Sequence, residues 1–180
     1  ALVFSYSHYL WQKASQEKDF SRARVLYHQS IKLNPHPENM RQYGIFYYSD
    51  GIKNQDRENI NWALYWAEMS ILKNSADALN HELRGRVYAS LGGALGDALA
   101  EADFKKAIEL NKFGPRHYLN LASYLISQGR KEEAKNIIKN ILDHYPEEVV
   151  NNKKLSIMSG QNIFSGIEGE IEGLKFILKN

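Results

Sequence analysis

Histidine is the residue type of this sequence that can perform the widest range of chemistry, because the 180 residues include no cysteine. A histidine metal site usually needs a fixed spacing, such as two histidines one helical turn apart with a glutamate beside the first. None of the six histidines has that spacing: His8, His28, His36, His81, His117 and His144. His36 stands between two prolines, and His81 precedes Glu82, so both are expected at the surface. The sequence therefore predicts no metal site and no catalytic histidine.

Two glycine-rich stretches are the other candidates for ligand chemistry. "GGALGD" at 92–97 lacks the Gly-Lys-Ser/Thr that a phosphate-binding loop needs, so it is expected to form a turn. "GIEGEIEG" at 166–173 is acidic and would repel a phosphate. We therefore expect no cofactor and no enzymatic activity.

The composition limits the remaining classes of function. A formal net charge of +2 does not indicate a nucleic-acid-binding surface. No segment has the run of about 20 apolar residues that a membrane span needs. Hydrophobic residues follow a helical period almost throughout, so the elements that position any site are expected to be helices.

A 17-residue pattern occurs twice, as "DFSRARVLYHQSIKLNP" at 19–35 and "RKEEAKNIIKNILDHYP" at 130–146. In each copy an alanine is followed by larger residues four and seven positions later, which places all three on one helical face. The small alanine allows a neighbouring helix to approach closely, and the final proline ends the helix. Asp19 is a good N-cap for the first copy, whereas Arg130 is a poor one for the second.

The second copy is preceded by another helical pattern, "YLNLASYLISQG" at 118–129. Gly129 is suited to the left-handed conformation that commonly ends a helix. The unit is thus helix, glycine turn, helix and proline, and it is 34 residues long if it begins at Pro115. Leu121, Ala122 and Ala134 are predicted to be buried between its two helices.

This pattern resembles the tetratricopeptide repeat (TPR), and four copies fit the chain at about 4–37, 37–77, 78–114 and 115–148. Their characteristic residues include Ala23, Tyr27 and Pro35; Tyr43, Gly44 and Ala63; Gly85, Ala100 and Phe104; and Leu121, Ala122, Gly129 and Ala134. The resemblance implies an all-α, right-handed superhelical solenoid of antiparallel helix pairs. Extra residues at 52–58 ("IKNQDRE") and within 92–97 are expected to form surface turns.

The last part of the chain, 149–180, does not repeat the pattern and is predicted to form C-terminal capping helices. Ile167, Ile171, Leu174 and Leu178 give 167–178 one apolar face, although Gly169 and Gly173 weaken it as a helix. Capping of the last repeat is the simpler interpretation. A helix that docks on a partner or on a second copy is the alternative.

The resemblance also implies a concave groove lined by the first helix of each pair, with a peptide or protein segment as its ligand. The matching positions are His8, Gln12 and Ser15; Arg41, Ile45 and Tyr48; Glu82, Arg86 and Ala89; and Leu119, Ser123 and Ile126. Arg41, Arg86, Tyr48 and Ile45 are the predicted anchors, because arginine and tyrosine dominate binding hot spots. The alternative is a solvated face that binds nothing.

One specialised TPR function does not fit. Repeats that clamp the C-terminal carboxylate of a chaperone use a set of lysine, asparagine and arginine residues. The matching positions here include His8, Gln12, Gln42, Leu79 and Leu83, so the required cations are missing.

Two functions remain open from the sequence. The first is a non-catalytic protein-interaction scaffold. The second is the TPR appendage of a polytopic membrane enzyme of cell-surface polysaccharide assembly, because the apolar and aromatic start "ALVFSYSHYLWQK" resembles the region after the last span of bacterial O-antigen ligase-like proteins. On that hypothesis the native chain continues upstream of Ala1 into a membrane tether, on the cytoplasmic or extracytoplasmic face of a bacterial membrane. Leu2, Val3 and Phe4 would then be exposed and could pair with another copy as a homodimer.

Overall fold

The computed structural model describes residues 2–143, 173, 175–177 and 179, with the side chains of residues 2–4 excepted. The chain divides into two compact units, residues 1–100 and 101–180, and each is described by itself. Every described element is an α-helix, and no strand occurs among the described residues. The expectation of an all-α chain is therefore confirmed.

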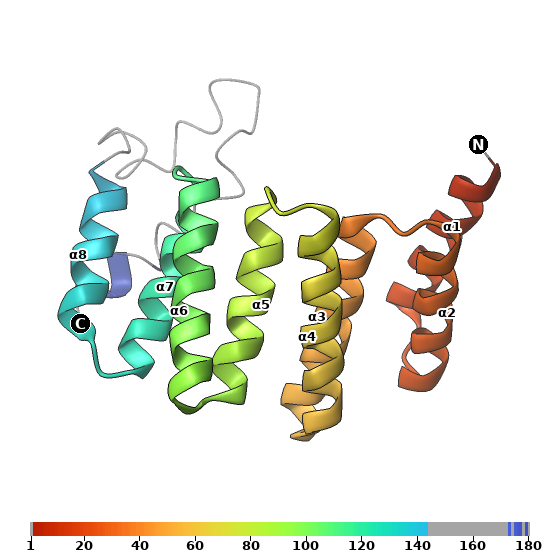
Figure 1. Cartoon of the computed structure of the whole chain (residues 1–180), viewed down its shortest axis with the longest axis horizontal. Coiled ribbons are helices and arrows are strands. Elements are labelled where there is room, and N and C mark those ends of the chain that lie inside the picture. The colour runs from red at the N-terminus through yellow and green to blue at the C-terminus, as the bar shows by residue number, and fades with distance from the viewer. Residues whose placement is uncertain (1, 144–172, 174, 178, 180) are drawn as a thin grey trace. The chain divides into compact units, whose positions relative to one another are not determined.

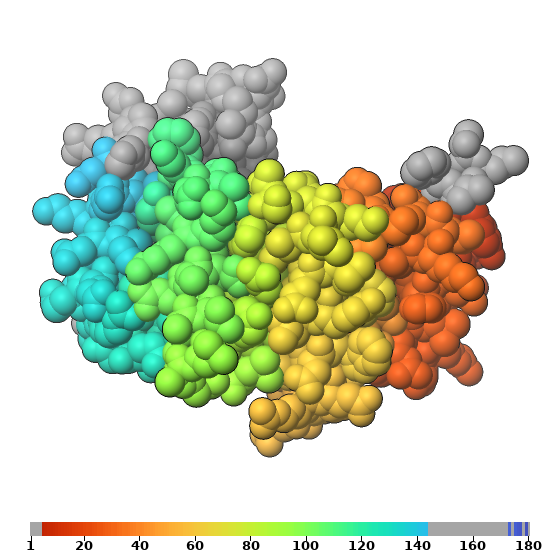
Figure 2. All heavy atoms as spheres, in the orientation of Figure 1, coloured from red at the N-terminus to blue at the C-terminus, as the bar shows by residue number. Residues whose placement is uncertain are grey.

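Within residues 2–143, eight helices follow one another with short connections (Figure 1). They are α1 (Leu2–Gln16), α2 (Phe20–Leu33), α3 (Pro37–Asn54), α4 (Arg57–Lys73), α5 (Ala78–Leu91), α6 (Gly93–Leu110), α7 (Pro115–Ser127) and α8 (Lys131–Leu142). Helix α6 crosses the boundary between the two units. Within each unit, side chains fill the spaces that the ribbons leave between neighbouring helices (Figure 2).

The division into four repeats stays a prediction. The predicted caps at 149–180 fall mostly outside the described residues, as do the side chains of Leu2, Val3 and Phe4 and all four apolar residues of 167–178 named above.

The first unit is held together by a cluster of aromatic rings. Tyr43 of α3 lies 5.5 Å from Tyr27 of α2 and 5.0 Å from Trp66 of α4, measured between ring centroids. Phe20 and Phe46 stack at 4.6 Å. Aromatic pairs in this distance range add stabilisation beyond their buried area, so this cluster fixes how α2, α3 and α4 pack together.

Small residues set the closest approaches between these helices. A Cβ atom placed on Gly44 would lie 2.9 Å from Leu83 Cδ2, 3.3 Å from Trp66 Cβ and 3.4 Å from the carbonyl oxygen of Ala63. Ser7 and Ser30 are both buried, and each hydroxyl donates to the other's carbonyl oxygen, at 3.0 and 2.9 Å, which joins α1 to α2.

The extra residues at 52–58 do not form the loop that the sequence predicts. Helix α3 continues to Asn54, α4 begins at Arg57, and only Gln55 and Asp56 turn the chain. Gln55 adopts a left-handed φ of 54°, and the Asp56 carboxylate accepts the backbone N–H groups of Glu58 and Asn59. A strong N-cap and a left-handed C-cap are thus enough to make the insertion helical.

The prediction of a turn over all of 92–97 is also wrong. Gly92 ends α5 with a φ of 67°, and α6 begins at the next residue. The insertion therefore lengthens the start of α6.

The second unit contains the predicted core of the last helix pair. Leu121 (2% exposed), Ala122 (0%) and Ala134 (0%) are buried, as predicted, together with Ile138 and Ile141 of α8. Phe104 of α6 packs on Tyr124 of α7 at 5.5 Å between ring centroids. Gly129 has a left-handed φ of 77°, which confirms its predicted place at the end of α7.

Candidate groove surface

The twelve predicted groove positions differ in how accessible their side chains are. His8, Gln12, Ser15 and Ser123 are exposed; Ile45, Tyr48, Arg86, Ala89, Leu119 and Ile126 are half-buried; and Arg41 and Glu82 are buried. Because a ligand needs accessible side chains, the last two are not suited to direct contact as they stand.

Arg41 was expected to be an anchor for a ligand, and the structure gives it a different role. Its Nη1 donates to Asp77 Oδ2 at 2.5 Å and to Asn80 Oδ1 at 3.3 Å, and its Nη2 lies 3.7 Å from Glu38 Oε1. Asp77 also caps α5 by accepting the N–H of Leu79. Arg41 therefore ties α3 to the first turn of α5.

The surface position expected for His81 is also wrong. The side chain is 7% exposed, and its Nε2 lies 3.0 Å from the carbonyl oxygen of Ser75. Its neighbour Glu82 is 3% exposed and equally part of the interior. Two adjacent polar residues can both be buried on α5 because other helices cover it broadly, which their local sequence does not reveal.

The structure brings two of the predicted anchors together. The guanidinium carbon of Arg86, on α5, lies 5.0 Å from the centroid of the Tyr48 ring, on α3. Both side chains are half-buried, and Ile45 lies one helical turn before Tyr48 on the same face. Within the described residues, Arg86 makes no ion pair, so a cation next to apolar surface remains available.

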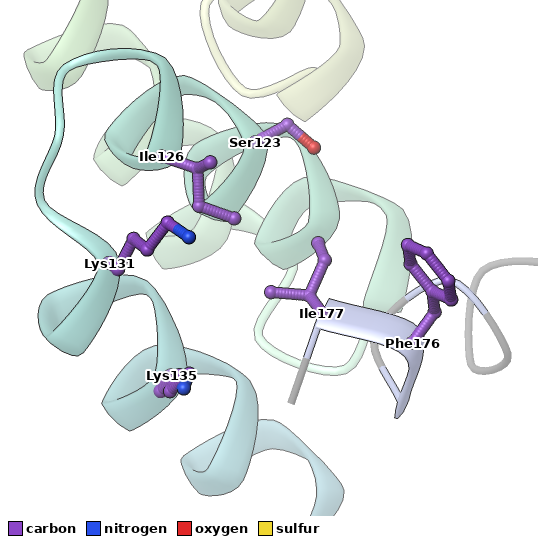
Figure 3. A pocket seen from close by; sticks show the side chains of 6 residues that line it. All are labelled: Ser123, Ile126, Lys131, Lys135, Phe176 and Ile177. Carbon is purple, nitrogen blue, oxygen red and sulfur yellow. The ribbon is translucent and has the colours of Figure 1, made fainter. Parts of the chain in front are cut away.

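A second accessible surface lies in the other unit, on α7 and the start of α8. A cavity of about 320 Å³ is bordered by Ser123, Ile126, Lys131, Lys135, Phe176 and Ile177 (Figure 3). Ser123 and Ile126 are predicted groove positions, whereas Phe176 and Ile177 come from the end of the chain. The groove prediction did not include these C-terminal residues or the two lysines, because it used only the first helix of each repeat.

The strongly shifted ionisable groups belong to structural contacts. Burial raises the pKa of Tyr43, whose hydroxyl donates to the carbonyl oxygen of Arg24 at 3.1 Å. Hydrogen bonds from Arg130 and Lys105 lower the pKa of Glu101 to about 2. Both groups join neighbouring helices, so neither indicates a catalytic centre.

The described part of the chain contains no group of three or more His, Asp or Glu side chains placed to hold a metal ion. None of its helices has both the length and the apolar character that crossing a membrane requires.

No protein-family model matches the sequence, and no curated protein matches it either. Solved structures do resemble it. A crystal structure of the MamA protein superposes with a TM-score of 0.62 at 17% identity, over 98% of this chain and 91% of that chain. A second MamA crystal structure gives 0.60 at 18% identity, over 93% and 89%. Residues 41 to the end of MamA from Desulfovibrio magneticus RS-1 give 0.55 at 17% identity, over 76% and 74%.

At sequence identities this low, the structural similarity establishes the fold alone. The function has to be argued from the chain's own surface. With its all-helical composition and its successive short-linked helices, the chain has the fold of the tetratricopeptide-repeat solenoids.

Proposed function

We propose that the chain is a non-catalytic scaffold that binds a peptide or protein segment on the groove face of its first helices. The observation that carries this proposal is the Arg86–Tyr48 contact of 5.0 Å, which joins two predicted anchors from separate helices. Ile45 of α3 and Ala89 of α5 add half-buried groove positions on the same two helices.

The Arg86–Tyr48 pair has the features of a preorganised recognition site. The guanidinium carbon lies over the face of the ring, and because arginine carries five N–H donors, donors remain for a ligand. Those donors suit a carboxylate or a backbone carbonyl of a ligand. Tyr48 is held from one side by Arg86, so less side-chain entropy is lost when a ligand binds.

Ile45 supplies the apolar part of the same surface. It lies three residues before Tyr48 on α3, and its side chain is half-buried. An apolar side chain next to a directed cation is the combination that binding hot spots use. The segment that fits best therefore carries an acidic residue close to an apolar one.

Arg41 enters this proposal as a supporting residue. Its bonds to Asp77 and Asn80 fix α5 against α3, the two helices that carry Arg86 and Tyr48. Replacing Arg41 would disturb binding by loosening that pair of helices, and it would also lower stability because Asp77 would lose its partner.

The proposal is tested by selecting binders from a random peptide display library on the immobilised full chain. The affinities of the selected peptides are then measured against Arg86→Gln and Tyr48→Ala. We expect each variant to bind about 5- to 30-fold more weakly, which corresponds to a hot-spot loss of about 1–2 kcal/mol.

Two matched variants serve as controls. Tyr48→Phe keeps the ring under Arg86 and should bind normally, and so should Arg57→Gln, which removes an exposed cation from α4. If no peptide is enriched, or if the selected peptides bind Arg86→Gln and Tyr48→Ala as well as the wild type, the proposal is wrong.

The alternative function, an appendage of a membrane enzyme of polysaccharide assembly, is favoured by no contact in the described residues. The upstream tether, the homodimer and the absence of nucleic-acid binding likewise stay predictions from the sequence. We therefore propose the scaffold alone.

A further inference from the structure

The described residues near the C-terminus lie against the groove face of α7. A Cβ atom placed on Gly173 would lie 3.4 Å from both methyl carbons of Leu119, so the backbone there passes directly over that side chain. Farther along, Ile177 and Phe176 border the same cavity as Ser123 and Ile126. All three groove positions predicted on α7 thus have C-terminal residues as neighbours.

The two apolar side chains at this end differ in orientation. Ile177 is half-buried, and Figure 3 shows it reaching from the C-terminal segment toward the space that Ile126 and Lys131 border. Phe176, the preceding residue, is 69% exposed. The segment therefore presents one side to α7, as an amphipathic helix in a groove does.

We propose that the described C-terminal residues (173, 175–177 and 179) are an internal occupant of the groove face of α7, so that a partner segment that binds there must displace them. This inference rests on the proposed function and adds the kind of partner that this part of the groove accepts. That partner is an amphipathic segment with an aliphatic anchor in the place of Ile177.

Chemistry and connectivity both support self-occupation. Leu119 and Ile126 lie seven residues apart on α7, two helical turns, and so form an aliphatic stripe on one face. A Cβ atom on Gly173 would be in van der Waals contact with Leu119, so the backbone there lies next to this stripe. An attached segment also competes at an effective concentration on the order of millimolar. The apparent affinity of an external ligand is consequently its intrinsic affinity multiplied by the fraction of molecules in which the site is free.

The first test is a crosslink between the segment and α7. The chain has no cysteine, so Ser123→Cys and Phe176→Cys introduce a single pair of thiols at the cavity and keep the Ile177 anchor. A short bis-maleimide should join them within one molecule, which mass spectrometry of the monomer detects.

Gly173→Trp provides the matched control for this crosslink. An indole extends well beyond a Cβ atom that already contacts Leu119, so we expect this substitution in the two-cysteine chain to displace the segment and abolish most of the crosslink. Lys179→Trp adds the same bulk at an exposed residue of this end of the chain that does not border the cavity, and it should leave the crosslink unchanged. A missing crosslink in the parent pair, or an unchanged one with Gly173→Trp, would overturn the proposal.

The second test measures competition with a fluorescent peptide of residues 165–180, SGIEGEIEGLKFILKN. It should bind the full-length Gly173→Trp chain at least about tenfold more tightly than the wild type, because the internal occupant has been removed. Adding Ile126→Asp should abolish the gain. Ile177→Asp is a second way to release the segment, and circular dichroism checks that each variant keeps its helices.

Equal affinity of this peptide for the wild type and both released variants would show that the segment does not occupy the groove. That result is separate from a failure of the proposed function, because the peptide test on Arg86 and Tyr48 uses neither α7 nor the C-terminal segment.

Discussion

Arg130 stands at the N-cap position of α8, where its side chain makes no capping hydrogen bond. It stabilises the start of the helix in another way. Its Nε and Nη2 donate to the two carboxylate oxygens of Glu133, both at 2.7 Å, and its Nη1 donates to Glu101 Oε2 on α6. Lys105 Nζ lies 2.6 Å from the other Glu101 oxygen. One residue thus connects α6 to the first turn of α8.

This arrangement predicts a pH-dependent loss of stability at the Glu101 side chain. Its pKa falls from 4.5 to about 2 because Arg130 and Lys105 favour the ionised form. The stabilisation is therefore complete above the ordinary pKa and is lost as the pH falls toward 2. Glu101→Gln should lower the free energy of unfolding at pH 7 by about 1 kcal/mol, since the cations are partly exposed, and this difference should vanish near pH 2.

Urea unfolding at pH 7, 4 and 2 measures this effect. Glu109→Gln is the control, because Glu109 pairs with Lys106 on the same helix but is 65% exposed. Its effect should stay below about 0.5 kcal/mol. A constant difference between the wild type and Glu101→Gln at all three pH values would contradict the prediction.

Single residues could be predicted from the sequence where their own type decides their place. Ala23, Ala63, Ala100 and Ala134 were matched to one position of the repeat, and all four have an exposed fraction of 0%. A small residue is required there by the close contact of two helices. The burial of Arg41 could not be predicted, because charged residues are normally exposed and its partner Asp77 is 36 residues away.

The ends of the helices were harder to predict than their existence. The sequence pattern predicts one helix before and one helix after residues 52–58. Because these residues are polar, it predicts a loop for them. In the structure they extend α3 and α4, since Asp50 accepts hydrogen bonds from the amide groups of Asn54 and Asn59 at 2.9 and 2.8 Å. Polar residues on a projecting helical turn look like loop residues in a sequence.

At the level of elements, Gly51 should be irreplaceable where α3 and α4 meet. A Cβ atom there would lie 2.7 Å from Ile60 Cδ1 and 3.0 Å from the backbone nitrogen of Ile60, and backbone cannot move aside easily. Gly→Ala in an unhindered helix stabilises by up to about 1 kcal/mol. Here Gly51→Ala should instead destabilise by about 1–3 kcal/mol, as overpacked cores do.

Thermal and urea unfolding of Gly51→Ala check the sign of the change. Ser49→Ala is the control on the same helix, because Ser49 is exposed and the variant should stay within about 0.5 kcal/mol of the wild type. A Gly51→Ala chain as stable as the wild type would mean that α3 and α4 lie farther apart than described.

The candidate groove is only partly predictable from the sequence, because it depends on contacts between different helices. Tyr48 and Arg86 were singled out separately, and nothing in the sequence shows that they stack across α3 and α5. For the C-terminal residues, the sequence allows both capping of the last repeat and docking on a partner or a second copy. Their position depends on which apolar face remains uncovered after the repeats have packed, which is a property of the assembled unit.

At the scale of the whole molecule, the described helices of each unit pack mainly on their neighbours in the chain. Among the described elements, α3 packs on α4, α1 on α2, α7 on α8 and α4 on α5, with smaller contacts of α3 with α5 and α2 with α3. Stability in such an array is approximately a sum of repeat and neighbour terms, so destabilisation at one end need not spread to the other. Local opening free energies should then differ along the chain.

This locality predicts the pattern of amide hydrogen exchange in Leu121→Ala. The side chain is 2% exposed between α7 and α8, so its truncation should cost about 2–5 kcal/mol through lost burial and a cavity. Protection measured by mass spectrometry should fall in α7 and α8 and remain near the wild-type level in α3 and α4. Leu72→Ala makes the same chemical change at a side chain that is 76% exposed, and it should leave both regions protected. Equal loss of protection in all described helices of Leu121→Ala would instead indicate that they unfold as a single cooperative unit. The cavity between α7 and α8 would then lower the opening free energy of every helix by the same amount.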